Sequence, residues 1–252
     1  MSLLDTITAG KSDLPPRIML YGYEGVGKST WAANAENPIF VQTEDGIRRI
    51  SVPKFPLAKS YEDVMNYLYT LATEEHNFKT VVVDSLSMLE ELIWKDVCKQ
   101  FKVDNIEKAD GGFAKGYKHA LNRWHDFLEL LNNINTKRNM TIILLAHVGT
   151  QEVKDPENQS FDRTAPRLHK LAEGVVSQWC DAVLFAHKEI VVRQLEEGFG
   201  STRGVALDKG DDIRVIRTIG SAAVIAKNRY NLPKQLPLDY SVLMEEIKKA
   251  DN

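Results

Sequence analysis

Residues 22–29 read Gly-Tyr-Glu-Gly-Val-Gly-Lys-Ser, an unbroken match to the pattern G-x-x-x-x-G-K-[ST]. A mostly apolar run at residues 17–21 precedes this stretch, and residues 30–33 continue it with helical character. Strand, glycine-rich loop and helix in this order are what a phosphate-binding loop requires. The stretch therefore predicts a nucleoside triphosphate site. A glycine-rich turn before an ordinary helix is the alternative, and the flanking elements disfavour it.

The residue types of this loop explain the expected chemistry. Glycines let the backbone bend with its N–H groups facing inward, at a helix N-terminus that attracts phosphate. We expect Lys28 to reach the β- and γ-phosphates and the Ser29 hydroxyl to bind Mg²⁺. The residues expected to hold ATP are Gly22, Tyr23, Glu24, Gly25, Val26, Gly27, Lys28, Ser29 and Thr30.

Length and composition are those of a globular domain. The chain has 252 residues, 43% of them hydrophobic and 27% charged, so it can bury a sizeable core. Residues 1–16 predict a flexible N-terminal segment, and residues 17–252 a single domain.

The longest apolar stretch, residues 142–146, is far too short to cross a bilayer, so we expect a cytoplasmic protein without membrane contact. A net charge of −3 gives no global basic field, so any nucleic acid must be bound by local loops.

Apolar β-branched runs alternate with helical patterns, which predicts a mainly parallel sheet with helices on both faces, an α/β fold. The expected strands lie at residues 17–21, 39–41, 80–83, 141–146 and 182–186. The expected helices lie at residues 61–75, 86–101, 117–137 and 240–249, and a polar region extends to Lys170. Short strands at residues 190–193, 212–219 and 222–226, joined by glycine-containing turns, predict an antiparallel extension of the same sheet.

Residues 80–85 read Thr-Val-Val-Val-Asp-Ser, an apolar strand that ends in an acid. In P-loop proteins an acid at the carboxyl end of a strand beside the P-loop strand holds Mg²⁺, usually through water. We expect Asp84 to take this role together with Ser29. An Asp after a buried strand also often caps the next helix, and Asp84-Ser85 suits an N-cap equally well.

Glu44 follows the second expected strand, and here the sequence begins to resemble the RecA-like ATPases. In that group a glutamate at the end of this strand polarises the water that attacks the γ-phosphate. A carboxylate suits this task because it accepts hydrogen bonds from water and can orient it. An exposed acidic turn at residues 44–46 is the alternative, and Asp45 is a second candidate for the role.

Two more features lie where the resemblance expects them. His147 follows the strand at residues 141–146, where RecA-like proteins carry a polar residue that senses the γ-phosphate; a polar cap on a buried strand is the other interpretation. Lys227 and Arg229 are similar to the Lys-x-Arg finger with which hexameric helicases and related filament ATPases reach a neighbouring subunit's nucleotide. Two cations one residue apart project from the same side of an extended chain. The alternative is a solvated basic pair.

Together these segments, over residues 17–249, resemble the small phage-type AAA-domain ATPases, minimal RecA-core proteins of which some act in single-strand annealing and recombination. The loop and Asp84 indicate only the P-loop superfamily. The order Glu44, His147, Lys227-x-Arg229 separates the RecA-like branch from kinases and GTPases. The resemblance of Lys227 and Arg229 to the finger implies a homo-oligomer in which they act in trans. The chain lacks room for the extra terminal domains of RecA itself, which leaves the choice between ring and filament open.

Two glycine- and lysine-containing segments, residues 102–118 and 149–170, are the candidate contacts for single-stranded DNA. Aromatic rings beside lysines can stack on bases and neutralise phosphates, and a mobile surface loop is the alternative. The sequence thus predicts an ATP- and Mg²⁺-dependent ATPase that acts on single-stranded DNA. A nucleotide-switched replication or packaging factor is the second hypothesis. A small-molecule kinase is third, because no arginine-rich lid follows the strand at residues 141–146.

Overall fold

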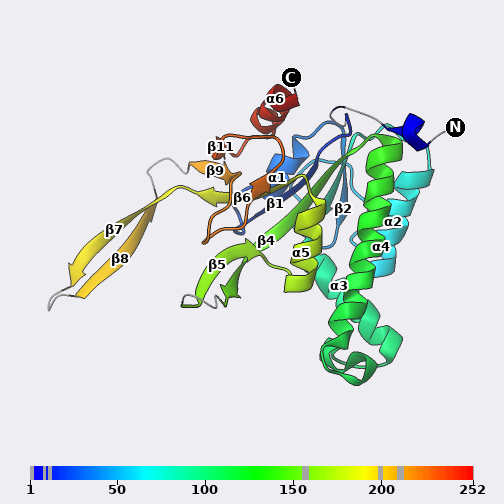
Figure 1. Ribbon diagram of the computed structural model, residues 1–252, viewed down its shortest axis with the longest axis horizontal. Coiled ribbons are helices and arrows are strands. Elements are labelled where there is room, and N and C mark those ends of the chain that lie inside the picture. Colours follow the sequence, from blue (N-terminus) through cyan, green and yellow to red (C-terminus); the bar gives the residue numbers. More distant parts are fainter. Residues whose placement is uncertain are drawn as a thin grey trace.

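Every strand that carries a candidate site residue lies in one twisted sheet, with helices on both sides of it (Figure 1). The computed structural model describes residues 3–7, 10, 13–154, 159–197, 201–208 and 213–251, so the N-terminal segment expected at residues 1–16 lies partly outside the described residues. The strands are β1 (Arg17–Gly22), β2 (Pro38–Gln42), β3 (Thr80–Asp84), β4 (Thr141–Val153), β5 (Phe161–Pro166), β6 (Ala182–Lys188), β7 (Ile190–Glu197), β8 (Ser201–Asp208), β9 (Arg214–Arg217), β10 (Lys227–Asn228) and β11 (Gln235–Pro237). The helices are α1 (Lys28–Ala33), α2 (Tyr61–Thr73), α3 (Leu86–Phe101), α4 (Lys115–Arg138), α5 (Lys170–Trp179) and α6 (Tyr240–Asp251), with short 3₁₀ turns η1 (Leu3–Thr6) and η2 (Ile106–Gly111).

The strand order of the main sheet is β11-β9-β6-β1-β4-β3-β2. The strands from β6 to β2 are parallel, and β9 and β11 extend the sheet in the antiparallel sense. The expected α/β fold with a mainly parallel sheet is therefore confirmed. One detail of the expectation is wrong: β3 does not lie beside the P-loop strand β1, because β4 is inserted between them. A single sequence carries no signal for this order, since all these strands are similar apolar runs.

The sheet separates two hydrophobic cores. Side chains alternate across it, so Met19 and Tyr21 of β1 pack on one side while Ile18 and Leu20 pack on the other. Helices α2 to α5 cover the first side, and α1 and α6 cover the second. Burial on both faces explains why these strands read as continuous apolar runs. It also leaves only the ends of the strands available for polar chemistry.

The polar region expected up to Lys170 contains regular structure that the sequence analysis missed. Strand β4 continues to Val153 and pairs with β5 in an antiparallel hairpin, with Val148 opposite Pro166. Helix α5 then begins at Lys170. Its short length and its Gly174 gave a weak helical pattern, and contacts with the rest of the fold hold it in place.

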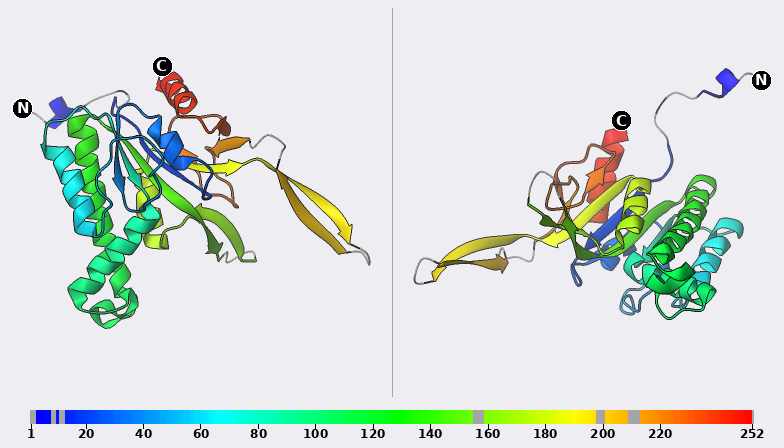
Figure 2. Two further views of the ribbon diagram at one scale, coloured as in Figure 1. Left: turned by 180° about the vertical axis from the view of Figure 1, so that it is seen from behind. Right: turned by 60° about the horizontal axis from the view of Figure 1, so that its bottom comes forward.

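The region after β6 was only partly predicted. Strand β7 pairs with β8 in a separate two-stranded hairpin that projects away from the body (Figure 2), so it does not extend the main sheet as expected. Residues 222–226 were expected to form a strand but lie in a tight turn with isolated bridges, one of them between Ser221 and Val224. Part of the strand expected at residues 212–219 forms β9, and Asp212 lies outside the described residues.

Glu90 connects α3 to the start of α5. Its side chain is only 6% exposed, and its two carboxylate oxygens accept the backbone N–H of His169, the N-cap residue of α5, at 2.9 and 3.0 Å. Burial raises the pKa of Glu90 to about 7, although the His169 hydrogen bond acts against this shift. The carboxyl group is therefore protonated in the folded protein at a pH where the unfolded chain has already lost the proton.

This raised pKa predicts that stability falls as the pH rises. Below about pH 4.5 the carboxyl is protonated in both states, whereas between about pH 4.5 and 7 unfolding releases a proton and becomes more favourable. Glu90→Gln cannot ionise, so its free energy of unfolding relative to wild type should rise by about 2 kcal/mol between pH 5 and pH 8. Urea unfolding at both pH values measures this difference. Glu91→Gln, at the exposed neighbour, is the matched control: the charge of Glu91 is the smallest cause of the raised pKa, so most of the wild-type pH dependence should remain.

Candidate functional site

The glycine-rich loop connects β1 to α1 and surrounds the ammonium group of Lys28. Lys28 is buried, and its Nζ donates to the carbonyl oxygens of Gly22 and Tyr23 at 2.9 and 3.0 Å. Gly22 is required by packing, because a Cβ there would lie 2.2 Å from the carbonyl oxygen of Ala186 in β6. Gly27 is required by backbone conformation, since its φ of 107° is rarely adopted by other residues. The loop is thus built to place a lysine at its centre.

Ser29 and Asp84 meet although they come from opposite sides of β4. Ser29 Oγ donates to Asp84 Oδ2 at 2.6 Å. Burial raises the pKa of Asp84, and the Ser29 hydrogen bond acts against this rise. Ser85 rather than Asp84 is the N-cap residue of α3, and its side chain makes no capping hydrogen bond. Asp84 is therefore not the cap of α3, and its role as a metal ligand stays a prediction.

Glu44 is held at the end of β2 by a clamp to the end of β3. The hydroxyl of Thr43 accepts the Ser85 N–H at 2.8 Å and donates to the Ser85 carbonyl at 2.7 Å, while the Thr43 N–H donates to the Asp84 carbonyl. The next side chain, Glu44, then reaches across to β4, where its carboxylate oxygens lie 2.9 and 3.1 Å from His147 Nε2. Two residues predicted separately therefore form one pair.

The electrostatics of this pair differ from those of Asp84. Burial acts to raise the pKa of Glu44, but the hydrogen bond and charge of His147, together with Lys28, outweigh it and hold the pKa below the usual value. Burial lowers the pKa of Lys28, and the nearby Asp84 and Glu44 act against this shift. The surroundings therefore favour the ionised form of Glu44, whereas burial disfavours the ionised forms of its neighbours Lys28 and Asp84.

Asp45, the second candidate for the catalytic role, points elsewhere. Its carboxylate binds the Arg48 guanidinium, with Arg48 Nε at 2.7 Å from Oδ1, and both side chains are exposed. Glu44, by contrast, keeps only 26% of its side chain exposed in its ion pair with His147. The structure thus brings together Lys28, Ser29, Asp84, Glu44 and His147, and leaves Asp45 at the surface.

Lys227 and Arg229 lie away from this cluster in their own chain. Lys227 is opposite Val183 in β6, and Val183 is opposite Met19 near the start of β1, whereas the loop follows the end of β1. The guanidinium of Arg229 donates to Asp181 Oδ1 at 2.9 Å and to the Gln178 carbonyl at 3.1 Å. The pair therefore lies near the opposite end of the sheet from the P-loop of the same subunit.

Arg214 is a residue near the loop that sequence reasoning missed. It begins β9, and its Nη1 lies 3.4 Å from the Val26 carbonyl and 3.2 Å from the position of a Cβ on Gly27. Because β9 runs antiparallel to β6, its first residue lies at the edge where the parallel strands end. Only this strand pairing reveals the proximity, since Arg214 is far from the loop in sequence and lies in no motif.

The two segments proposed for DNA contact meet in space. The ring of Tyr117, from residues 102–118, stacks on the ring of His169, from residues 149–170, with centroids 4.2 Å apart and planes 2° from parallel. Phe113 is 95% exposed near the junction of η2 and α4. Residues 155–158 of the second segment lie outside the described residues.

The residue types present fit a magnesium nucleotide. Ser29 and Asp84 offer two oxygen ligands of the kind that Mg²⁺ prefers, 2.6 Å apart. The ammonium group of Lys28 donates to two loop carbonyls, and it can donate to triphosphate oxygens in their place. The described residues contain no group of three or more His, Cys, Asp or Glu side chains that could hold a metal ion. In the same part of the chain, no helix combines the length and the apolar character that a membrane span needs.

Fold and site together define an α/β protein whose P-loop connects β1 to α1 in a mainly parallel sheet. The chain belongs to the AAA domain family, whose model matches residues 14–230. A curated relative, the SPbeta prophage-derived uncharacterized protein YorG of Bacillus subtilis (strain 168), is 23% identical over 136 residues; the match covers 52% of this chain and 41% of that protein. The crystal structure of the RadB recombinase aligns over 88% of this chain and 86% of that one, with 15% identity and a TM-score of 0.46.

The geometry of Lys28 predicts that nucleotide binding depends on this side chain. Its ammonium lies inside the loop, whereas Arg214 reaches the loop only at the Val26 carbonyl, and the loop amides supply only neutral dipoles. Lys28→Ala should therefore abolish tight ATP binding, as measured by fluorescence titration with a labelled ATP analogue. Lys54→Ala, at a lysine outside the loop, is the control. Unchanged affinity in correctly folded Lys28→Ala protein would contradict the assignment of the site.

Proposed function

We propose that the protein binds ATP with Mg²⁺, hydrolyses it, and couples hydrolysis to work on single-stranded DNA in recombination or annealing. The observation that carries the proposal is the convergence of Lys28, Ser29, Asp84, Glu44 and His147 at one edge of the sheet. Membership of the AAA domain family supports the nucleotide. The prophage origin of the relative YorG supports a phage-encoded protein that acts in the host cytoplasm.

Each residue has a defined part in this mechanism. Lys28 would hold the β- and γ-phosphate oxygens, and Ser29 and Asp84 would hold Mg²⁺, which would supply positive charge to the phosphate oxygens. A bound cation also removes the cost of ionising the buried Asp84, and bound phosphates do the same for Lys28. The buried negative charge of Asp84 thus complements the metal ion, and the buried positive charge of Lys28 complements the phosphates.

Glu44 is the group that positions the attacking water. Its ionised carboxylate accepts a hydrogen bond from the water and takes its proton as the new P–O bond forms and the bond to the ADP oxygen breaks. His147 holds this carboxylate through Nε2, while its Nδ1 is buried without a hydrogen-bond partner among the described residues. Nδ1 is therefore the atom through which His147 can respond to the γ-phosphate.

We assign Lys227 and Arg229 to the nucleotide of a neighbouring subunit in a homo-oligomer. Their position at the far end of their own sheet does not allow them to serve their own loop. A finger that acts in trans must exchange the Asp181 carboxylate for phosphate oxygens, which carry more negative charge. Assembly would then determine when Arg229 leaves Asp181.

A nucleotide-switched accessory protein with slow ATPase is the alternative that the site also permits. The two hypotheses differ in the response to DNA. Strong stimulation of ATP turnover by single-stranded DNA supports the recombinase proposal, whereas nucleotide-dependent binding of a protein partner without DNA stimulation supports the switch. ATP turnover measured with and without single-stranded DNA, at several protein concentrations, separates them.

Glu44→Gln should separate binding from chemistry. The amide keeps the size and hydrogen bonding of the side chain but cannot take a proton, so ATP should still bind while turnover falls by about 10²-fold or more. The measurement is steady-state phosphate release beside an ATP binding titration. Asp45→Asn is the matched control, because that carboxylate binds Arg48 at the surface, and it should keep near wild-type turnover. The opposite pattern would transfer the role to Asp45.

Mixing two inactive variants tests the assignment in trans. Arg229→Ala should lower turnover with ATP affinity nearly intact, because the finger acts mainly on charge that develops in the transition state. Glu44→Gln keeps its finger and Arg229→Ala keeps its water-positioning carboxylate, so an interface between them can contain one complete site. The mixture should recover part of the wild-type rate, and wild-type specific activity should rise with protein concentration. No recovery, with activity independent of concentration, would rule out the trans mechanism.

A further inference from the structure

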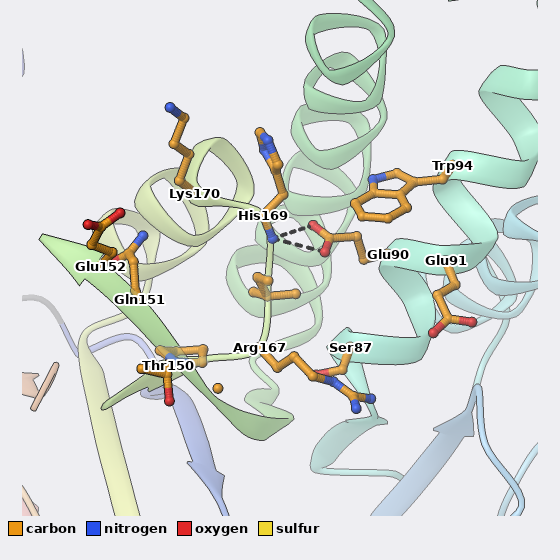
Figure 3. Close-up of a pocket in the computed structure, with 13 residues that line it drawn as sticks. Ser87, Glu90, Glu91, Trp94, Thr150, Gln151, Glu152, Arg167, His169 and Lys170 are labelled. Carbon is orange, nitrogen blue, oxygen red and sulfur yellow. Dashed lines mark hydrogen bonds between the residues drawn. The ribbon is translucent and has the colours of Figure 1, made fainter. Parts of the chain in front are cut away.

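A cavity of about 650 Å³ lies beside the ATP site, between α3, the far half of β4 and the turn into α5 (Figure 3). We name it the Glu90 cavity. Its volume is in the range of pockets that hold small ligands. The lining residues on which the inference depends are Ser87, Glu90, Trp94, Arg167 and Lys170. No residue of the catalytic cluster lines it, so it is a separate site.

The wall and floor of the Glu90 cavity have contrasting chemistry. Trp94 extends from α3 toward Glu90 (Figure 3), and its ring lies edge-on to Tyr117, 5.6 Å between centroids. Tyr117 in turn stacks on His169, so three aromatic rings stabilise one side. On the floor, the Glu90 carboxylate accepts one backbone N–H and no side-chain donor among the described residues. A carboxylate has about four acceptor positions, so this group can accept further hydrogen bonds from a ligand.

The charges at the rim limit what the ligand can be. The cations Arg167 and Lys170 are exposed there, but Glu91 and Glu152 line the same cavity and are exposed as well. Lys170 points away from Glu90 (Figure 3). The cavity therefore offers no net positive surface for a run of phosphates. It suits an uncharged aromatic ring with amino groups, whose one or two flanking phosphates lie at Arg167 or Lys170.

We propose that the Glu90 cavity binds one unpaired base of single-stranded DNA, with Trp94 as the stacking surface and the Glu90 carboxylate as the acceptor for an amino group of the base. This inference rests on the proposed action on single-stranded DNA and names a base-binding site for it. Proteins recognise unstacked bases in this way, through aromatic stacking and hydrogen bonds to the base edge. Cytosine, adenine and guanine carry amino groups, whereas thymine presents carbonyl oxygens on both sides of its only N–H. The site should therefore reject thymine.

The cavity is also linked to the ATP site by a short contact. Ser87 lines the cavity, and its Oγ accepts the backbone N–H of His147 at 3.1 Å. His147 binds Glu44, so a single residue separates the cavity wall from the carboxylate that positions water. A base that shifts Ser87 can thus change the position of Glu44, which gives DNA a direct route to the rate of hydrolysis.

The test uses the full chain and two labelled probes, 15-nucleotide oligomers of deoxycytidine and of deoxythymidine, with binding followed by fluorescence anisotropy. The measurement is made at pH 8, where the Glu90 carboxyl, with a pKa of about 7, is ionised. Wild type should bind the cytidine oligomer about tenfold more tightly than the thymidine oligomer. Glu90→Gln supplies a donor as well as an acceptor, so it should bring the two affinities close together. Glu91→Gln, at the exposed acid of the same cavity, should keep the wild-type ratio.

Trp94 gives a second and independent variant. Trp94→Ala should weaken both oligomers about tenfold by removing the stacking surface, and Trp94→Phe should restore most of the affinity. ATP binding by each variant, measured in parallel, shows that the protein is folded. Equal wild-type affinity for the two oligomers, or a ratio that Glu90→Gln leaves unchanged, would overturn the base-binding site alone. A wild-type protein that binds ATP but neither oligomer would overturn the proposed action on DNA as well.

Discussion

The hydrogen bond between Ser29 and Asp84 is the contact on which the site depends, because it joins strands that are not neighbours. Ser29 follows β1 and Asp84 ends β3, while β4 lies between them. The two side chains meet because the ends of β1 and β3 lie within two residues of each other along β4, with Gly22 opposite His147 and Asp84 opposite Leu145. A shift of one residue between β3 and β4 would turn the side chain of Asp84 to the other face of the sheet, away from Ser29. The register of the sheet, as much as the loop itself, therefore makes the site.

The same edge concentrates charge that the free protein compensates poorly. Burial raises the pKa of Asp84 and lowers that of Lys28, so both groups are held in surroundings that disfavour their ionised forms. The two hydrophobic cores on the faces of the sheet stabilise the fold, so it tolerates the unfavourable burial of these two groups. The proposed magnesium nucleotide would bring a cation to Asp84 and anions to Lys28, and it would thereby stabilise the ionised forms that burial disfavours. Ligand binding and folding stability should be linked at this edge.

Local patterns predicted most of the parallel sheet, because each buried strand and each helix leaves a periodic signal in its own residues. Pairings between distant residues left no such signal. Glu44 and His147 were each predicted from their place after a strand, but their contact depends on the order of β2, β3 and β4. Helix α5 was missed because its own sequence is a weak helix former and Glu90, distant in sequence, holds its first turn. The Glu90 cavity could not be predicted either, because three segments that are distant in sequence line it.

Helix α3 directly connects the candidate ATP site to the Glu90 cavity. It begins directly after the strand that carries Asp84, and it places Ser87 and Glu90 one turn apart on the cavity side. Three residues of an α-helix span about 4.5 Å, so Ser87 and Glu90 move as one rigid unit. If a base binds at Glu90 as proposed, a displacement of α3 would reach the His147 backbone through Ser87, and a displacement of His147 would act on the cavity in return. The proposed coupling between ATP and DNA would then require the movement of one helix and no rearrangement of the sheet.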